Sequence, residues 1–213
     1  VQYGAKNQMT YTVYFAGELF DHKHLAGNLL LAQAIERASN NRYQCLLPQV
    51  WEAGMDTRDV AVRNKDIAML KQSDVALFNF DGTDIDSGTV AEFMLAKMLD
   101  IPSVLLRTDC RQSGDMNGGN WNLMLEGYPR TVTVKISALH EYNTRGIDAL
   151  HTYLGELIAN ALDTVRTTQP VMKNPDQIRA LYEHCIDMCG SGIEQVISPH
   201  AIDEIVTRKI ERK

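Results

Sequence analysis

The chain has 213 residues, enough for one domain with a full hydrophobic core and an appended segment. Apolar residues make up 45% of it, which is ordinary for a globular protein, and no apolar run approaches the length of a membrane span. The net charge of −6 argues against a nucleic-acid polymer as partner, because a phosphate backbone needs a basic surface.

The amino terminus and the cysteines bear on where the protein works. Residues 1–8 are polar and lack the apolar stretch of a signal peptide. Val1 stands where a methionine is expected, so we expect residues 1–8 to be a cloning remnant and Met9 to be the native start. The four cysteines are too few and too scattered for a disulfide scaffold. We therefore expect a cytoplasmic protein with no membrane partner.

The first part of the chain alternates predicted strands with predicted helices. Tyr11–Ala16 and Tyr43–Leu47 are rich in β-branched and aromatic residues, which is typical of strands. Apolar residues recur at helical spacing over Leu25–Ala38 and, less regularly, over Arg58–Gln72. Pro48 ends the second strand, and we expect a loop between it and the second helix.

Residues 74–107 contain a complete strand-helix-strand unit. Val75–Phe80 is an apolar run closed by an Asp-Gly pair, and Ser103–Arg107 is a second such run after a proline. Between them, apolar residues fall at helical spacing: Val90, Phe93, Met94 and Met98. Two parallel strands joined by a helix are the natural interpretation.

The rest of the chain adds one strand and several helices. A polar loop over 108–119 precedes a short apolar segment at 122–125, and Thr131–Ile136 alternates as a fifth strand. We expect three further helices: about Gly146–Arg166, Asp176–Cys189 and His200–Lys213.

This order of elements predicts an α/β fold. Alternating strands and helices favour a flavodoxin-like, doubly wound, five-stranded parallel sheet with helices on both faces. The proline-bearing stretch Thr167–Pro175 is typical of a hinge. We therefore predict an α/β domain over 9–168 and a helical C-terminal extension over 169–213.

A group of acidic residues follows the third predicted strand. In such sheets the ligand crevice lies beyond the carboxyl ends of the strands. Asp81, Asp84 and Asp86 lie there, and Glu92 follows one turn into the helix. Crowded carboxylates repel one another and raise pKa values, and packing gives no reason for them. We interpret them as a site, although Asp86 could be only a helix cap and Glu92 only a first-turn acid favoured by the helix dipole.

Other motifs give no support for a cofactor or a metal. The chain has no G-x-G-x-x-G after the first strand and no G-x-x-x-x-G-K-[ST] anywhere, so dinucleotide and P-loop sites lose their main support. The pairs His22/His24 and Cys185/Cys189 lack further spaced ligands, which favours surface and core roles over metal binding. We expect neither a cofactor nor a metal.

Four short segments, taken in order, resemble the nucleoside 2-deoxyribosyltransferases. They are Tyr14-Phe15-Ala16-Gly17, Arg63-Asn64-Lys65-Asp66, Asp86-Ser87-Gly88-Thr89-Val90-Ala91-Glu92 and Asn122-Leu123-Met124-Leu125. The resemblance covers roughly residues 10 to 135, the length of one domain. It implies that the substrates are 2′-deoxynucleosides and free nucleobases.

The resemblance implies a double displacement at the anomeric carbon of the sugar. Glu92 would be the nucleophile that attacks C1′, because an oxocarbenium-like transition state calls for a nearby carboxylate. Tyr14 would hydrogen-bond Glu92 and orient it. Asp86 and Asp66 would hold the base and exchange a proton with it, a task that favours a raised pKa. Structural alternatives stay open: the Tyr14 hydroxyl could be satisfied elsewhere, and Asp66 could be a solvated helix acid.

The same comparison implies which residues contact the substrate. They are Gly17, Gln49, Asp81, Gly88, Asn122 and Met124. Asn122 and Met124 would reach into a neighbouring subunit's site, so a homo-oligomer with shared active sites is implied. Ordinary core packing is the alternative role for Met124, because methionine fills gaps.

The chain also departs from the family pattern. Phe93-Met94 follows Glu92, whereas many relatives carry a glycine two residues after the glutamate. The C-terminal helices extend beyond the point where small members end, so a role for a terminal carboxylate cannot be transferred to Lys213.

Two other functions stay open. One is a 2′-deoxynucleoside 5′-monophosphate N-glycosidase, in which water replaces the second base and Ser113 and Gly114 could serve the phosphate. The other is a non-catalytic nucleotide-binding sensor on the same fold.

Overall fold

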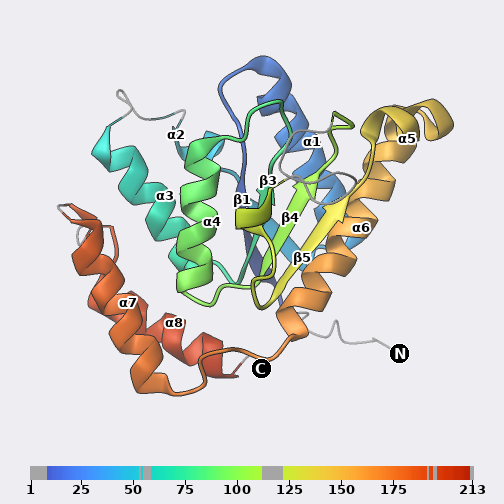
Figure 1. Cartoon of the computed structure of the whole chain (residues 1–213). Helices are drawn as coiled ribbons and strands as arrows, with labels where there is room; N and C mark the ends of the chain where they lie inside the picture. The colour runs from blue at the N-terminus through green and yellow to red at the C-terminus, as the bar shows by residue number, and fades with distance from the viewer. Residues whose placement is uncertain are drawn as a thin grey trace, which may run out of the picture.

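A five-stranded, all-parallel sheet forms the centre of the protein. The computed structural model describes residues 9–52, 54, 59–111, 122–190, 192–193 and 196–211. The strand order is β2-β1-β3-β4-β5, which confirms the predicted flavodoxin-like sheet (Figure 1). The strands are β1 (Tyr11–Ala16), β2 (Tyr43–Leu46), β3 (Val75–Asn79), β4 (Ser103–Arg107) and β5 (Thr131–Lys135).

Helices cover both faces of this sheet. On one face lie α1 (His22–Ala38) and α6 (Ile147–Thr167), whose apolar side chains share a core with Val13, Phe15 and Leu77. The two helices approach closely at Gly155, where a Cβ atom would lie only 2.5 Å from the Ala34 backbone oxygen. Glycine at this position is what lets α1 and α6 pack so tightly.

The second face carries α3 (Val60–Gln72) and α4 (Ser87–Met98). Phe93 of α4 packs edge-on against Phe78 of β3, with ring centroids 5.4 Å apart. Because β1 and β3 are covered on both sides, their side chains are buried except for the half-buried Tyr11, Thr12 and Asn79, as their mainly apolar sequences predict. Met98 does not share this burial; it is 68% exposed at the end of α4.

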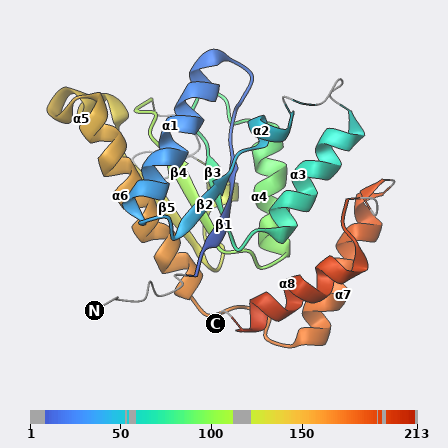
Figure 2. The same ribbon diagram turned by 180° about the vertical axis from the view of Figure 1, so that it is seen from behind.

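The C-terminal helices α7 (Pro175–Cys189) and α8 (Pro199–Glu211) extend the second layer. Figures 1 and 2 show them beside the lower ends of α3 and α4, where the sheet strands begin. Tyr182 of α7 is fully buried, and the buried residues Ile178 and Ile205 belong to the same apolar cluster as Phe93. A division of the chain near residue 168 stays a prediction, but these helices share the core of the sheet.

One prediction about local structure was wrong, and one helix was not predicted. We expected a loop after Pro48, but α2 (Pro48–Glu52) begins at that residue, since proline is well tolerated in the first turn of a helix. The helix expected from about Gly146 is confirmed as α6, but the preceding helix α5 (Ala138–Arg145) was not predicted; it ends before Gly146, whose φ is 75°. No residue of α5 is buried, so it has no apolar pattern in the sequence.

The other predicted elements agree with the structure to within about three residues. None of the described helices is both long enough and apolar enough to cross a membrane.

Candidate active site

A buried tyrosine and a glutamate form the centre of the acidic site. Tyr14 comes from β1 and Glu92 from the second turn of α4, which follows the neighbouring strand β3. The Tyr14 hydroxyl donates a 2.7 Å hydrogen bond to Oε1 of Glu92. Tyr14 is fully buried, and Glu92 is partly buried. The bond to Glu92 rules out the alternative that the Tyr14 hydroxyl is satisfied away from the site.

The surroundings of Glu92 disfavour its charged form. Burial raises the pKa of Glu92 to about 8, and the negative charges of Asp66, Asp86 and Glu52 act in the same direction. The hydrogen bond from Tyr14 opposes this shift, because it stabilises the carboxylate. Burial and the Glu92 charge also raise the pKa of Tyr14, so Tyr14 stays a proton donor. The site holds a poorly solvated carboxyl that a nearby positive charge would ionise.

A hydrogen bond from a tryptophan holds the Asp66 carboxylate at this site. Trp51 lies on α2, and its indole Nε1 donates a 2.8 Å hydrogen bond to Oδ1 of Asp66. The Trp51 ring also lies beside Tyr14, with 6.5 Å between ring centroids. Asp66 is half-buried in this position, so it is not merely a solvated acid on a helix surface.

Asp86 both caps α4 and contributes charge to the site. Its Oδ2 accepts hydrogen bonds from the backbone N and the Oγ1 of Thr89, each 2.7 Å long. Both bonds use the same oxygen, so Oδ1 has no partner among the described residues. A Cβ atom at Gly88 would lie 3.2 Å from Oδ2, so the small residue leaves this carboxylate room. Capping and substrate contact are therefore compatible.

The other two carboxylates of the acidic loop do not belong to this group. Asp81 accepts hydrogen bonds from the backbone N (2.5 Å) and Oγ1 (2.6 Å) of Thr108 and from the backbone N of Asp109 (2.9 Å). Asp84 is exposed. The expected crowd of Asp81, Asp84, Asp86 and Glu92 is corrected here, because the negative charges that act on Glu92 come from Asp66, Asp86 and Glu52.

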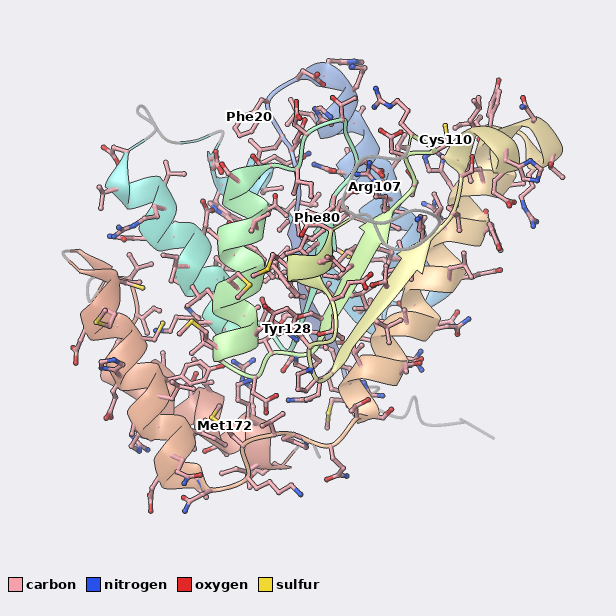
Figure 3. All side chains as sticks on the ribbon, in the orientation of Figure 1. Phe20, Phe80, Arg107, Cys110, Tyr128 and Met172 are labelled. Atoms are coloured by element: carbon pink, nitrogen blue, oxygen red, sulfur yellow. The ribbon has the colours of Figure 1, made fainter. Side chains whose placement is uncertain are left out.

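A buried arginine, Arg107, fixes the loops behind the acidic residues. It ends β4, is 1% exposed and is labelled in Figure 3. Its guanidinium donates to the backbone oxygens of Phe80, Gly82 (3.1 Å) and Arg111 (3.3 Å). The loops after β3 and β4 are thereby held together. The sequence analysis assigned it no role, although a cation that closes an apolar strand is a recognisable signal.

Gly17 and Gln49 lie at the ends of their elements on the same edge of the sheet. A Cβ atom at Gly17 would come within 3.2 Å of the Asn79 Cβ, so glycine permits the ends of β1 and β3 to meet. The Gln49 amide donates to the Leu25 backbone oxygen (3.0 Å) and accepts from Asn28 (3.4 Å). It ties α2, which carries Trp51, to α1.

The Asn-Leu-Met segment forms a short turn with an exposed side. Asn122 caps the 3-10 helix η1 (Leu123–Leu125), its Oδ1 accepting a 2.9 Å bond from the Met124 backbone N. Met124 is 71% exposed, whereas Leu125 is buried. Core packing therefore does not explain Met124.

Two site features of the sequence analysis require separate comment. Ser113 and Gly114 lie outside the described residues. In the described part of the chain, no three His, Cys, Asp or Glu side chains come together as a possible metal site.

Comparison with known proteins links this chain to one family. A family model described as nucleoside 2-deoxyribosyltransferase matches residues 13–124, which is more than half of the chain. No curated protein matches the chain.

The solved structures that match the chain include three at low sequence identity. A conserved protein from Enterococcus faecalis V583 is 22% identical, with 83% of this chain and 99% of that chain covered and a TM-score of 0.42. A 2-deoxyribosyltransferase from Bacillus psychrosaccharolyticus is 16% identical, with 65% of this chain and 95% of that chain covered and a TM-score of 0.43. A 2-deoxyribosyltransferase from Leishmania mexicana is 21% identical, with 68% of this chain and 97% of that chain covered and a TM-score of 0.47.

Proposed function

The chain belongs to the nucleoside 2-deoxyribosyltransferase family, and we propose that it transfers 2-deoxyribose between nucleobases through a covalent intermediate on Glu92. The observation that carries this proposal is the Tyr14–Glu92 pair at the carboxyl edge of the sheet. The fully buried Tyr14 hydroxyl holds the half-buried Glu92 carboxyl in one orientation, as a nucleophile requires.

The first displacement breaks the bond between the sugar and its base. An oxygen of the Glu92 carboxylate bonds to C1′ while the N-glycosidic electron pair leaves with the base. The base departs more readily once protonated, and the proton that Glu92 loses on ionising reaches the base through Asp86 or Asp66. The product is a deoxyribosyl ester of Glu92 and a free base.

The second displacement restores the enzyme. A ring nitrogen of the incoming base attacks C1′, and the ester electron pair returns to the Glu92 oxygen. The incoming base gives up a proton to the carboxylate that protonated the first base, so protons balance over the cycle. No cofactor or metal takes part in either step.

The raised pKa of Glu92 suits this sequence. Burial makes the ionised form of Glu92 unfavourable in the free enzyme. A positive charge that develops on the sugar ring stabilises that ionised form and so favours ionisation during the reaction. Tyr14 keeps the attacking oxygen in one orientation during that change.

We further propose that the active sites are shared in a cytoplasmic homo-oligomer. The exposed Met124 and its neighbour Leu123, 49% exposed, offer apolar contacts to a second subunit. Gly17, Gln49, Gly88 and Asn122 complete the proposed substrate-contacting set. We propose that Asp81 acts on the site only indirectly, by holding the loop after β4.

A base-exchange assay tests the proposed activity. A 2′-deoxynucleoside is mixed with a different free base, and both nucleosides are followed by chromatography. Formation of the new deoxynucleoside supports transfer. Free deoxyribose phosphate from a nucleotide, without exchange, would indicate the N-glycosidase. Nucleoside binding without turnover, unaffected by Glu92→Gln, would indicate a sensor.

A further inference from the structure

A second cavity lies at the opposite edge of the sheet from Glu92. It has a volume of about 70 Å³ and is bordered by Tyr11 at the start of β1, by Asp74 before β3 and by Pro102 before β4. Its other walls are α8 and the segment 167–172 that leaves α6; Figure 3 labels Met172 on this segment. At about 10 to 15 Å³ for each water, the cavity has room for about five waters or one small oxyanion.

Cationic side chains dominate the walls of this cavity. Four of the lining residues carry a positive charge and two carry a negative charge, and they come from distant parts of the chain: Arg130, Arg166, Arg208, Lys209, Asp74 and Asp100. Three of these cations form ion pairs, Arg166 with Asp163 outside the cavity at 3.5 Å. Lys209 forms none within the described chain, and it requires an explanation because an unpaired charge is seldom buried.

Each of the two carboxylates forms an ion pair with one of these cations and also accepts hydrogen bonds from other groups. Oδ2 of Asp74 accepts from the backbone N (2.8 Å) and Oγ1 (3.1 Å) of Thr12, and Oδ1 lies 3.6 Å from Arg208. Oδ2 of Asp100 accepts from the backbone nitrogens of Val171 and Met172, at 2.9 and 3.2 Å. Asp74 thus pairs with Arg208 and Asp100 with Arg130, and neither forms an ion pair with Lys209.

Two of the cations have unused hydrogen-bonding capacity. Arg130 pairs with Asp100 at 3.1 Å, yet its buried Nε finds no acceptor among the described residues. Lys209 forms no hydrogen bond or ion pair within the described chain; its ammonium lies 5.5 Å from the centre of the Tyr182 ring. Burial and the nearby Arg130 charge lower the pKa of Lys209 to about 8, and the negative charges of Asp100 and Asp74 oppose this shift only in part.

We propose that this cavity binds a small phosphate-class oxyanion, with Lys209 and Arg130 as its principal donors. Such an anion accepts hydrogen bonds through every oxygen, which matches walls that offer donors. It would connect the strand β1, the segment 167–172 and α8, and so fasten the C-terminal helices to the sheet. This site is independent of the proposed transfer reaction, whose nucleoside substrates carry no phosphate.

Phosphate binding to the full-length protein tests the proposal directly. Inorganic phosphate is titrated at constant ionic strength, with sodium chloride as the balancing salt, and the thermal unfolding midpoint is recorded. We expect the midpoint to rise with phosphate and the affinity of Lys209→Gln to be about tenfold weaker, as for loss of one charge-assisted bond. Lys173→Gln is the matched control, since Lys173 is an exposed lysine on the adjoining segment.

The outcomes separate the proposal from general salt effects. A midpoint that responds equally to phosphate and chloride, or an equal phosphate response in all three proteins, would overturn it. If Lys209→Gln does not fold, phosphate binding is measured instead by the broadening of the ³¹P resonance of phosphate on addition of the wild-type protein. Broadening that survives saturation of the active site with a deoxynucleoside supports the distant site, and broadening abolished by it refutes the site, whether or not base exchange occurs.

Discussion

Replacing Tyr14 by phenylalanine removes one hydrogen bond from Glu92 and keeps the aromatic ring. A bond to a charged acceptor contributes about 1.5 to 3 kcal/mol, and one to a neutral acceptor about 0.5 to 1.5 kcal/mol. Removing the hydrogen bond therefore destabilises the ionised form of Glu92 more than its protonated form, by about 1.4 kcal/mol, which corresponds to one pKa unit. Since the pKa of Glu92 is about 8 in the wild type, we expect it to move to about 9 in the variant.

The pH dependence of kcat/KM for base exchange measures this shift. The ionised carboxylate is the nucleophile, so kcat/KM rises with pH through the pKa of Glu92 in the free enzyme. In Tyr14→Phe this rise should occur about one unit higher, and at pH 7 kcat/KM should fall about tenfold because fewer molecules carry the carboxylate.

Tyr43→Phe provides a matched control. Tyr43 is also fully buried and donates a 2.7 Å hydrogen bond to a carboxylate, that of Asp163, but it lies on the edge strand β2 away from Glu92. This variant should lose stability without moving the pH dependence. An unshifted profile for Tyr14→Phe, or equal shifts in the two variants, would refute the proposed link between Tyr14 and the ionisation of Glu92.

Three further predictions concern the surroundings of the site. Folded Glu92 keeps its proton to about pH 8 whereas the unfolded residue loses it near 4.5, so the free energy of unfolding should fall by about 2.5 kcal/mol from pH 5 to 7 through this group. Urea titrations of Glu92→Gln should lack that part of the fall; an identical pH dependence would contradict the raised pKa. Trp51→Phe removes the indole hydrogen bond to Asp66, so kcat/KM for exchange should drop about fivefold with an unchanged circular dichroism spectrum. Asp81→Ala leaves the donors of Thr108 without their acceptor and should cost about 2 kcal/mol of unfolding free energy in urea, and a loss below about 0.5 kcal/mol would argue against this role.

The sheet could be predicted because buried parallel strands are marked by unbroken apolar runs. Val75–Asn79 and Ser103–Arg107 are buried on both faces, and their sequences contain few residues that suit any other environment. The short helix α5 could not be predicted from periodicity, because it buries no residue. The only sequence signals for it are its two capping residues, Ser137 and Gly146.

The candidate site was only partly predictable, and the reason is the geometry of its loops. Tyr14 and Glu92 meet because β1 and β3 are neighbours, which follows from the strand order. Asp81 is near Glu92 in sequence, but the loop turns its carboxylate to Thr108. Trp51 belongs to a five-residue helix, too short for a periodic signal, so its bond to Asp66 needed the structure.

Buried cations form the other feature that the sequence concealed. Lys71 is fully buried on α3 and donates to the Tyr182 backbone oxygen at 3.2 Å. Sequence periodicity assigns lysines to the solvent-exposed side of a helix, and only the packing of α7 shows that this one is covered.

Trapping of the sugar on the enzyme tests the central claim most directly. The protein is incubated with a 2-fluorinated deoxynucleoside, in which the electron-withdrawing fluorine disfavours the oxocarbenium-like state and slows release of the ester. Mass spectrometry of the digested protein should then find the fluorinated sugar on the peptide that contains Glu92, and none in Glu92→Gln. Base exchange without any labelled peptide, or a label on a different residue, would contradict Glu92 as the nucleophile.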